Sequence, residues 1–215
     1  MVATLLDVEQ AVRLIADSVV ENEKYFGDLD AVVGDGDFGY SMARGFEVVL
    51  SDWDGIDRSD VSTFLKKIAV VITSRIGGTS GPIWGTGFLR AATTAAGAET
   101  LETDQIAAML RAAIDGIKAR GGAELGEKTL LDALDPATSA IEAEAEKGAT
   151  PSDTRRAAAV AARSAAEATR EMQARRGRAS YTGERSIGSL DAGAVAVAVL
   201  LEAIADKWPE ATPTI

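Results

Sequence analysis

The stretch LDAVVGDGDFG, residues 29–39, contains the glycine pattern G-x-G-x-x-G, which in many α/β proteins forms a loop around dinucleotide phosphates. Such a loop follows a strand, opens a helix and is completed by a returning parallel strand. Residues 29–33 could form the first strand, but the chain after Leu50 reads SDWDGIDRSD and then continues with another helical pattern. Because no second strand follows, the sequence favours a helical protein over a doubly wound sheet.

Apolar residues recur with the period of an α-helix through most of the chain. We therefore expect an all-α fold of roughly eight helices without a confident strand. The alternating VAVAV run at 195–199 has no hairpin partner and is expected to be helical, whereas Pro136 is expected to divide one helical segment into a pair. The expected helices cover residues 7–19, 38–50, 59–72, 82–96, 103–117, 130–134 with 137–146, 151–174 and 190–204.

Composition limits the available chemistry. The 215 residues carry a net charge of −11 and include neither His nor Cys. The negative charge argues against nucleic acid and anionic membranes as partners, because both need a basic face. Without His and Cys there is no thiolate nucleophile, no Cys-ligated metal and no imidazole base. Carboxylates, hydroxyls, Lys, Arg, backbone amides and bound ions must therefore supply any chemistry.

Length and patterning predict one domain over residues 1–215, located in the cytoplasm. The chain is 47% hydrophobic and 26% charged, which suits one domain with a full core. The first twenty residues carry acids early and lack the basic start and apolar block of a signal peptide. The longest apolar run, residues 192–201, is too short to span a bilayer.

Three acids, Asp30, Asp35 and Asp37, lie in or next to the glycine pattern. Carboxylates beside a bare pyrophosphate would repel it in a low dielectric. They are useful if Mg²⁺ lies between, because this ion binds through one or two carboxylates together with phosphates and water. The alternative is that the acids form a turn and cap the following helix. Taken alone, the pattern supports both interpretations about equally.

Three other connections are also rich in glycine. In residues 76–88, Thr79 and Ser80 precede a Gly-Pro helix start, which suits either an anion or an ordinary cap. Residues 175–194 bring four arginines into an acidic chain, where they could bind polyphosphate, cover a site, dock an acidic partner or simply pair with surface acids. The four connections together favour a ligand site at one end of a bundle.

The segment GGAELGEKTLL, residues 121–131, loosely resembles a phosphate-binding Walker loop. In that motif Lys directly follows the last glycine, but here Glu127 separates Gly126 from Lys128. The required preceding strand is also missing. We therefore reject a Walker motif, while contact of this connection with a nucleotide stays open.

In combination, these segments resemble the L subunit of dihydroxyacetone kinase, the nucleotide-binding half of that enzyme. Four long stretches carry the resemblance in the family's order along nearly the whole chain. They are LDAVVGDGDFGYSMARGF (29–46), GGTSGPIWGTGFLRAA (77–92), GEKTLLDALDPA (126–137) and RRGRASYTGERSIGSLDAGA (175–194).

The resemblance implies a barrel of eight antiparallel helices that binds ADP or ATP between the loops at one end. It implies that Asp30, Asp35 and Asp37 hold two Mg²⁺ ions bridging the phosphates and that these acids and Arg178 serve catalysis. The implied nucleotide contacts are Phe38, Gly39, Tyr40, Ser41, Thr79, Ser80, Gly121, Leu130, Arg178, Asp191, Ala192 and Gly193.

The resemblance further implies a kinase that phosphorylates dihydroxyacetone or a related short ketose held on a separate K-type subunit. A phosphotransferase-system phosphodonor protein and a transcription regulator are further possible partners, and the nucleotide is either rephosphorylated in place or exchanged. Phe38 departs from the family pattern, which usually has His after the third aspartate. This departure leaves room for an alternative, a non-catalytic magnesium–nucleotide sensor that docks on a regulator or a kinase partner.

Overall fold

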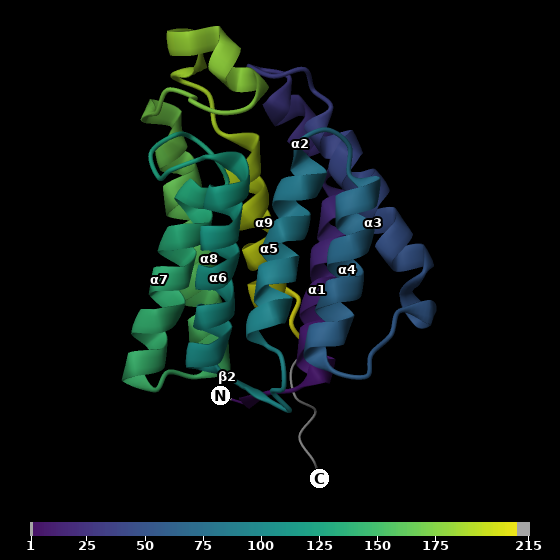
Figure 1. The fold of residues 1–215 in the computed structure, drawn as a ribbon. Coiled ribbons are helices and arrows are strands. Elements are labelled where there is room, and N and C mark those ends of the chain that lie inside the picture. Colours follow the sequence, from purple (N-terminus) through teal and green to yellow (C-terminus); the bar gives the residue numbers. More distant parts are fainter. Residues whose placement is uncertain (1, 210–215) are drawn as a thin grey trace.

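The computed structural model describes residues 2–209, which consist almost entirely of helices (Figure 1). Two two-residue strands, β1 (Val2–Ala3) and β2 (Leu101–Glu102), pair antiparallel beside the start of a helix. Three short 3₁₀ segments are η1 (Trp53–Gly55), η2 (Thr169–Glu171) and η3 (Arg178–Ser186). The α-helices of this range are α1 (Leu5–Glu21), α2 (Glu23–Asp30), α3 (Phe38–Ser51), α4 (Val61–Arg75), α5 (Ser80–Thr94), α6 (Thr103–Gly121), α7 (Leu131–Lys147), α8 (Pro151–Ala168) and α9 (Ala192–Asp206).

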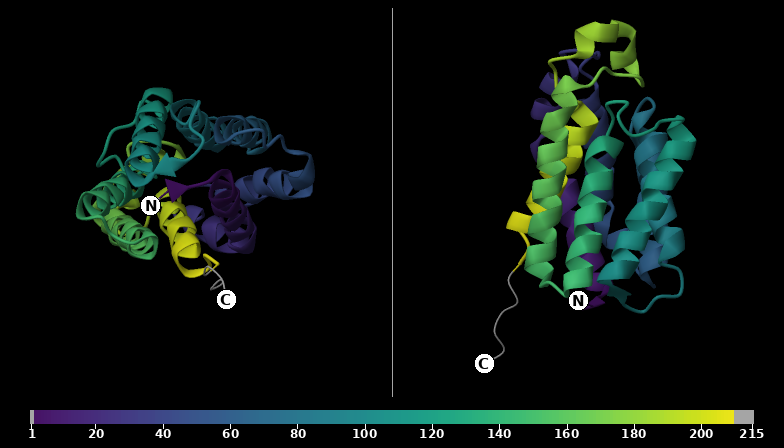
Figure 2. Two further views of the ribbon diagram at one scale, coloured as in Figure 1. Left: turned by 90° about the horizontal axis from the view of Figure 1, so that it is seen from below. Right: turned by 90° about the vertical axis from the view of Figure 1, so that its left-hand side faces the viewer.

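Eight of the helices in residues 2–209 form a closed antiparallel ring, which Figure 2 shows end-on in its left view. Helix α1 contacts α3, each helix from α3 to α8 contacts the next, and α9 packs against both α8 and α1. The short α2 lies at one end of the ring and packs on α3 and α9. The predicted all-α barrel of eight helices is confirmed, with α2 as an addition.

Two kinds of side chain fill the interior of the ring. Around α1, α3 and α4 the core is built from aromatic and branched side chains, such as Phe46, Phe64 and Ile68. Around α7, α8 and α9 it is built largely from alanines, such as Ala133 and Ala162. Small side chains allow helix axes to approach closely. In this half of the ring the helix backbones therefore pack near one another, without large side chains between them.

The structure corrects two of the expected helix boundaries. Helix α7 runs through Pro136 without a break, because a proline removes only one amide donor and the flanking turns remain packed against α6 and α8. Helix α8 ends at Ala168 rather than near residue 174. The buried Thr169 turns the chain there, since its hydroxyl donates to the Ala166 carbonyl and accepts from the Asp191 amide. The helical prediction for residues 195–199 is confirmed.

Antiparallel neighbours place every second connection at the same end of the ring. Figure 1 and the right view of Figure 2 show that α1 begins at one end of the ring and that the connections named below lie at the other end. None of the helices in the described range is long and apolar enough to cross a membrane. The connections gathered at the end opposite the start of α1 are α2–α3 (31–37), α4–α5 (76–79), α6–α7 (122–130) and α8–α9 (169–191).

Candidate functional site

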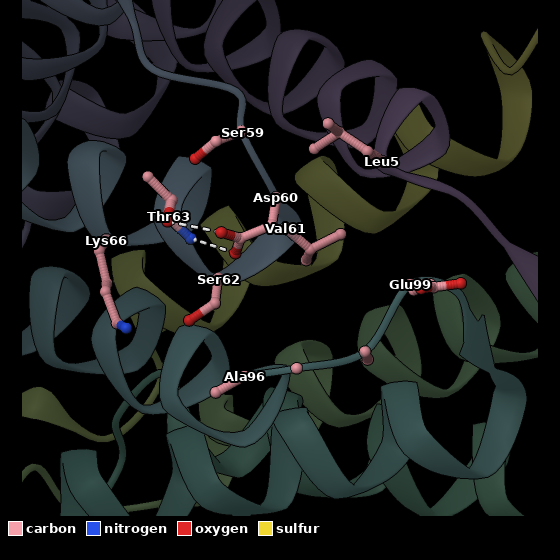
Figure 3. A pocket seen from close by; sticks show the side chains of 11 residues that line it. Leu5, Ser59, Asp60, Val61, Ser62, Thr63, Lys66, Ala96 and Glu99 are labelled. Atoms are coloured by element: carbon pink, nitrogen blue, oxygen red, sulfur yellow. Dashed lines mark hydrogen bonds between the residues drawn. The ribbon is translucent and has the colours of Figure 1, made fainter.

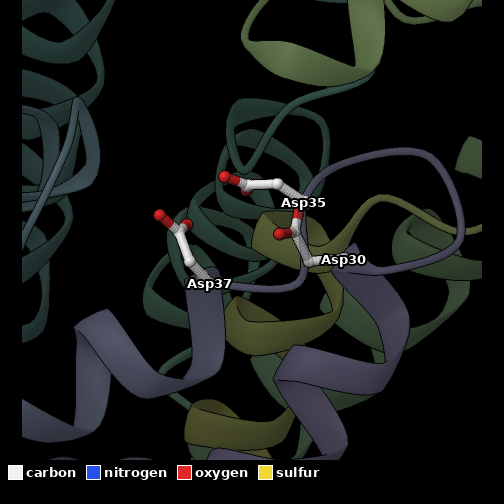
Figure 4. A group of neighbouring side chains, drawn as sticks. All are labelled: Asp30, Asp35 and Asp37. Atoms are coloured by element: carbon white, nitrogen blue, oxygen red, sulfur yellow. The ribbon is translucent and has the colours of Figure 1, made fainter.

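Three carboxylates converge where α2 gives way to α3 (Figure 4). Asp30 ends α2, Asp35 lies in the connection, and Asp37 directly precedes α3. Each offers one carboxylate oxygen, and these three oxygens all lie within 4.8 Å of one another. The side chains point into a common space, so the acids predicted from the sequence do meet in the fold.

The backbone of the connection holds Asp30 in place. Its carbonyl accepts the Gly34 amide at 2.6 Å, and its Oδ2 accepts the Gly36 amide at 2.9 Å. Gly36 has a φ of 76°, a left-handed conformation that glycine adopts at little cost. A Cβ on Gly34 would lie 2.3 Å from Asp30 Oδ1, so a side chain there would collide with the carboxylate. Gly34 and Gly36 thus allow the backbone to hold the Asp30 carboxylate in its place.

The Asp37 side chain does not cap the helix that follows it. Asp37 occupies the N-cap position of α3, yet its side chain makes no capping hydrogen bond. Instead, Arg178 from η3 forms ion pairs with Asp35 and, at 2.9 Å, with Asp37. The first and last of the predicted site segments therefore meet. Of the two interpretations that the sequence left open, this geometry favours a site for cationic groups over a simple helix start.

The surroundings shift the pKa values of Asp30 and Asp35 in opposite directions. Burial raises the pKa of Asp30, and the nearby charges of Asp35 and Asp37 raise it further, against hydrogen bonds from the backbone of Phe38 and Gly36 that lower it. The Arg178 guanidinium holds the pKa of Asp35 below its ordinary value, and the two acids raise the pKa of Arg178. The carboxylate oxygens here surround the positive charge of Arg178. Oxygen atoms of this kind are also the ligands that Mg²⁺ prefers. The three acids therefore fit a divalent cation.

The α4–α5 connection lies beside the first turn of α3. A Cβ on Gly77 would lie 3.1 Å from the hydroxyl oxygen of Ser41, which is one helical turn after Asp37. Thr79 is the N-cap residue of α5, and its side chain makes no capping bond. Ser80 is the first residue of α5. The hydroxyls and free amides at this helix start are thus available to an anion.

A second group of predicted residues gathers at the start of α9. Gly193 lies against Leu130, whose Cβ and amide nitrogen would be 3.3 and 3.4 Å from a Cβ at residue 193. Ala192 is the first residue of α9, and Asp191 caps the helix by accepting the Ala194 amide at 2.7 Å.

Asp191 is also the most perturbed acid of this group. Loss of hydration raises its pKa to about 7, and the charges of Asp132 and Asp30 act in the same direction, while the Ala194 amide and Lys128 oppose them. Its electrostatic coupling to Asp30 links the start of α9 to the three acids.

Four other predicted residues lie in different surroundings. Phe38 packs on Phe26 with ring centroids 6.2 Å apart, and Gly39 is buried against the backbone of α2. Tyr40 is 59% exposed beneath the guanidinium of Arg44, and Gly121 lies against Ile83 of α5. Any nucleotide contact by Phe38, Gly39 or Tyr40 therefore stays a prediction.

The segment 172–189, here called the arginine loop, lies at the same end of the ring as the α2–α3 connection (Figure 1). Its Arg178 reaches the acids and pairs with Asp35 and Asp37. Arg176 pairs with Glu127 at 2.6 Å, as expected of an arginine that simply balances a surface acid. Sequence reasoning missed two residues that hold these connections. The Asp132 carboxylate accepts the amides of Gly126 and Thr129 at 2.5 and 2.7 Å, and Lys128 is buried beneath the loop.

A pocket at the opposite end of the ring lies between the start of α4 and the connection after α5 (Figure 3). Three of its polar residues already have partners inside the protein. Asp60 caps α4 by accepting the amide and hydroxyl of Thr63 at 2.8 Å each, and Ser62 donates to the Ala92 carbonyl. These internal bonds, and its distance from the acids, make this pocket the weaker candidate.

Comparison with known proteins places this geometry in a family. The DAK2 domain matches residues 32–206. The chain belongs to this family. It is 38% identical over 182 residues to the ADP-binding subunit DhaL of the PEP-dependent dihydroxyacetone kinase of Escherichia coli (strain K12), covering 85% of this chain and 87% of that subunit. The predicted resemblance to the kinase L subunit is thereby confirmed.

Two larger proteins match this chain over about a third of their length. An L-erythrulose 1-kinase of Mycolicibacterium smegmatis is 39% identical over 193 residues, covering 86% of this chain and 33% of that kinase. The solved structure of the dihydroxyacetone kinase from C. freundii in complex with AMP-PNP and Mg²⁺ matches with a TM-score of 0.74 and 27% identity, covering 93% of this chain and 33% of that one. The chain thus spans about a third of both proteins.

Proposed function

We propose that this chain is the nucleotide-binding subunit of a dihydroxyacetone-type kinase and binds ADP or ATP with two Mg²⁺ ions. The observation that carries the proposal is the convergence of Asp30, Asp35 and Asp37, within 4.8 Å, under an arginine from a distant segment. The relative in Escherichia coli is an ADP-binding subunit, and the C. freundii structure holds AMP-PNP and Mg²⁺. The whole chain from 1 to 215 would act as one nucleotide-binding domain.

Each part of the site has a role in phosphoryl transfer, which depends mainly on positioning and charge stabilisation. When bound, Mg²⁺ supplies neutralisation of charge on the phosphates. Asp30, Asp35 and Asp37 hold the cations. Thr79 and Ser80 offer hydroxyls, and the first amides of α5 offer donors, to the phosphate oxygens.

The remaining contacts orient the nucleotide and the transferred group. Ser41 lies beside the α4–α5 connection, while Leu130 and Gly193 pack together as one wall of the nucleotide pocket. Arg178 is placed to stabilise negative charge that develops on the transferred phosphoryl group. The acceptor is dihydroxyacetone or a related short ketose on a separate K-type partner, and a phosphotransferase-system protein is the candidate donor.

A second candidate is a magnesium–nucleotide sensor that docks on a regulator or kinase partner without catalysis. Phe38 is the observation in its favour, because the family's usual His is replaced by a side chain that packs on Phe26 and has no hydrogen-bonding group. Both functions would use the three carboxylates, but Arg178, which would stabilise charge on a transferred phosphoryl group, favours the kinase.

The test has two stages. ADP with Mg²⁺ at about one hundred times its Kd should stabilise the chain by about 2.7 kcal/mol, and EDTA should remove the effect. Turnover is then measured with a cognate K-type subunit, a phosphoryl donor and short ketoses. Stabilisation without turnover would favour the sensor, and the lack of any stabilisation by nucleotide would refute both functions.

A further inference from the structure

Lys128 lies in the α6–α7 connection, and only 2% of it is exposed to solvent. Its φ of 62° places it in the left-handed region, which is unfavourable for a residue with a Cβ and is usually occupied by glycine. Lysine therefore stands at a position where both its backbone conformation and the burial of its charge are costly. A side-chain role that offsets these costs is required.

The ammonium group of Lys128 binds both ends of the arginine loop. Its Nζ donates to the Met172 carbonyl at 3.1 Å, where the loop begins. It also donates to the Ser186 carbonyl and to the Ser189 carbonyl at 2.8 Å, where the loop ends. Ser189 Oγ is a further acceptor at 3.2 Å. An ammonium has three N–H donors, so these carbonyls use its full capacity.

No carboxylate lies within ion-pair distance of Lys128 among residues 2–209. Burial lowers the pKa of Lys128, and the negative charge of Asp191 opposes this shift. The group is thus not one half of a buried salt bridge. Its interactions are with the main chain of the arginine loop, whose two ends it holds side by side.

The arginine loop has further attachments to the barrel. The Arg175 amide donates to the Glu127 carbonyl at 3.0 Å, Arg176 pairs with Glu127 at 2.6 Å, and the Arg170 guanidinium donates to the Gly188 carbonyl at 3.0 Å. Within it, the Ala174 amide donates to Ser186 Oγ at 2.9 Å, and at its base the Gly188 amide donates to the Arg170 carbonyl at 2.8 Å. Further out, Arg178 has a side chain that is 53% exposed where it meets the acids. The position of this guanidinium therefore depends both on the contacts with Glu127 and on closure of the base of the loop.

We propose that Lys128 is a positioning residue: its ammonium clamps the two ends of the arginine loop and so sets Arg178 over Asp35 and Asp37. The catalytic consequence rests on the proposed function, because it requires Arg178 to act on a phosphoryl group. The clamp itself does not, because it concerns the order of the loop in the free protein.

The first experiment measures the clamp without nucleotide or partner. Lys128→Met keeps most of the aliphatic stem and removes the ammonium, while Lys118→Met is the matched control, since Lys118 pairs with Glu124 in the same connection. Hydrogen exchange followed by mass spectrometry should show peptides of the arginine loop exchanging about tenfold faster in Lys128→Met. Peptides from α1, α4 and α5 should be unchanged, and the control should match the parent.

Loop exchange that stays at the parental rate in folded Lys128→Met would overturn the clamp, and so would an equal increase in every peptide. If Lys128→Met does not fold, Lys128→Gln is used, because its amide retains two donors. Faster exchange confined to the loop is expected for it as well, and unchanged or uniformly faster exchange would again refute the proposal.

The second experiment measures the catalytic consequence with the partner subunit. Lys128→Met should lower kcat by about the same factor as Arg178→Ala, and the double variant should lose little more than either one, as coupled residues do. Fully multiplicative losses would show that Lys128 does not act through Arg178. If no variant or parent turns over while the loop exchange responds as predicted, the clamp stands and the kinase function fails.

Discussion

Gly39 provides a sharp test of how the site is built. It lies in the first turn of α3 and is buried against α2. A Cβ added there would be 1.9 Å from the Glu23 carbonyl oxygen and 2.5 Å from the Gly27 nitrogen. Both atoms belong to the backbone of α2, so neither can rotate away. In Gly39→Ala, the start of α3 must separate from α2.

The size of this separation follows from contact distances. A carbon atom approaches a carbonyl oxygen to about 3.3 Å, so the two helices must part by roughly 1.4 Å. Overpacking of this kind costs about 1–3 kcal/mol, which for a chain of this length lowers Tm by roughly 2–12 °C. Asp37 moves with α3 while Asp30 stays with α2. Because metal sites tolerate errors of only about 0.2 Å, affinity for ADP with Mg²⁺ should fall at least about tenfold.

Thermal unfolding and isothermal titration with ADP and Mg²⁺ measure both effects. Gly55→Ala is the matched control, because a Cβ at this exposed glycine in η1 meets nothing within 4 Å. It should change neither Tm nor affinity. If Gly39→Ala retained the parental Tm and affinity, the close packing of α2 on α3 would not be what brings the acids together.

Three further predictions concern single side chains. Asp37→Ala should abolish Mg²⁺-dependent ADP binding and leave the helical circular dichroism unchanged. The control is Asp28→Ala, which removes an exposed acid of α2 that pairs with Lys24 and should bind ADP normally. Equal binding by the two variants would refute the metal assignment. Arg178→Ala should lower kcat more than nucleotide affinity in a coupled assay, and equal losses would make it a binding contact alone. Because the pKa of Asp191 is raised from 3.8 to about 7, its ionisation costs the free protein stability as pH rises through this window. In chemical denaturation, the free energy of unfolding of Asp191→Asn should therefore exceed that of the parent by up to about 4 kcal/mol at pH 8 and equal it near pH 4. A difference that stays constant with pH would contradict this prediction.

The helical period predicted most helices of the ring well, because each long helix buries one apolar face, whereas the closed barrel was predicted from the resemblance to the kinase family. What it could not predict are features set by contacts between distant segments. Pro136 looked like a break, but packing on both sides keeps α7 continuous. Thr169 ends α8 early through a hydrogen bond to Asp191, a residue more than twenty positions away.

Sequence reasoning about the site was strongest for the acids. Glycines between Asp30, Asp35 and Asp37 indicated that the three carboxylates could converge, and they do. The nucleotide contact of Tyr40 stays a prediction, because its exposed ring lies beneath the Arg44 guanidinium, an arrangement that no local pattern predicts. Lys128 was passed over because its burial comes from the arginine loop folding over it, which no local pattern reveals.

The most direct test of the central claim is a crystal structure of the chain grown with ADP and Mn²⁺ in place of Mg²⁺, with anomalous diffraction used to locate the metal. We expect an anomalous peak between the carboxylates of Asp30, Asp35 and Asp37 and the nucleotide phosphates, with Arg178 released from Asp35. A structure with bound ADP, no peak at these acids and Arg178 still paired to both Asp35 and Asp37 would contradict the account.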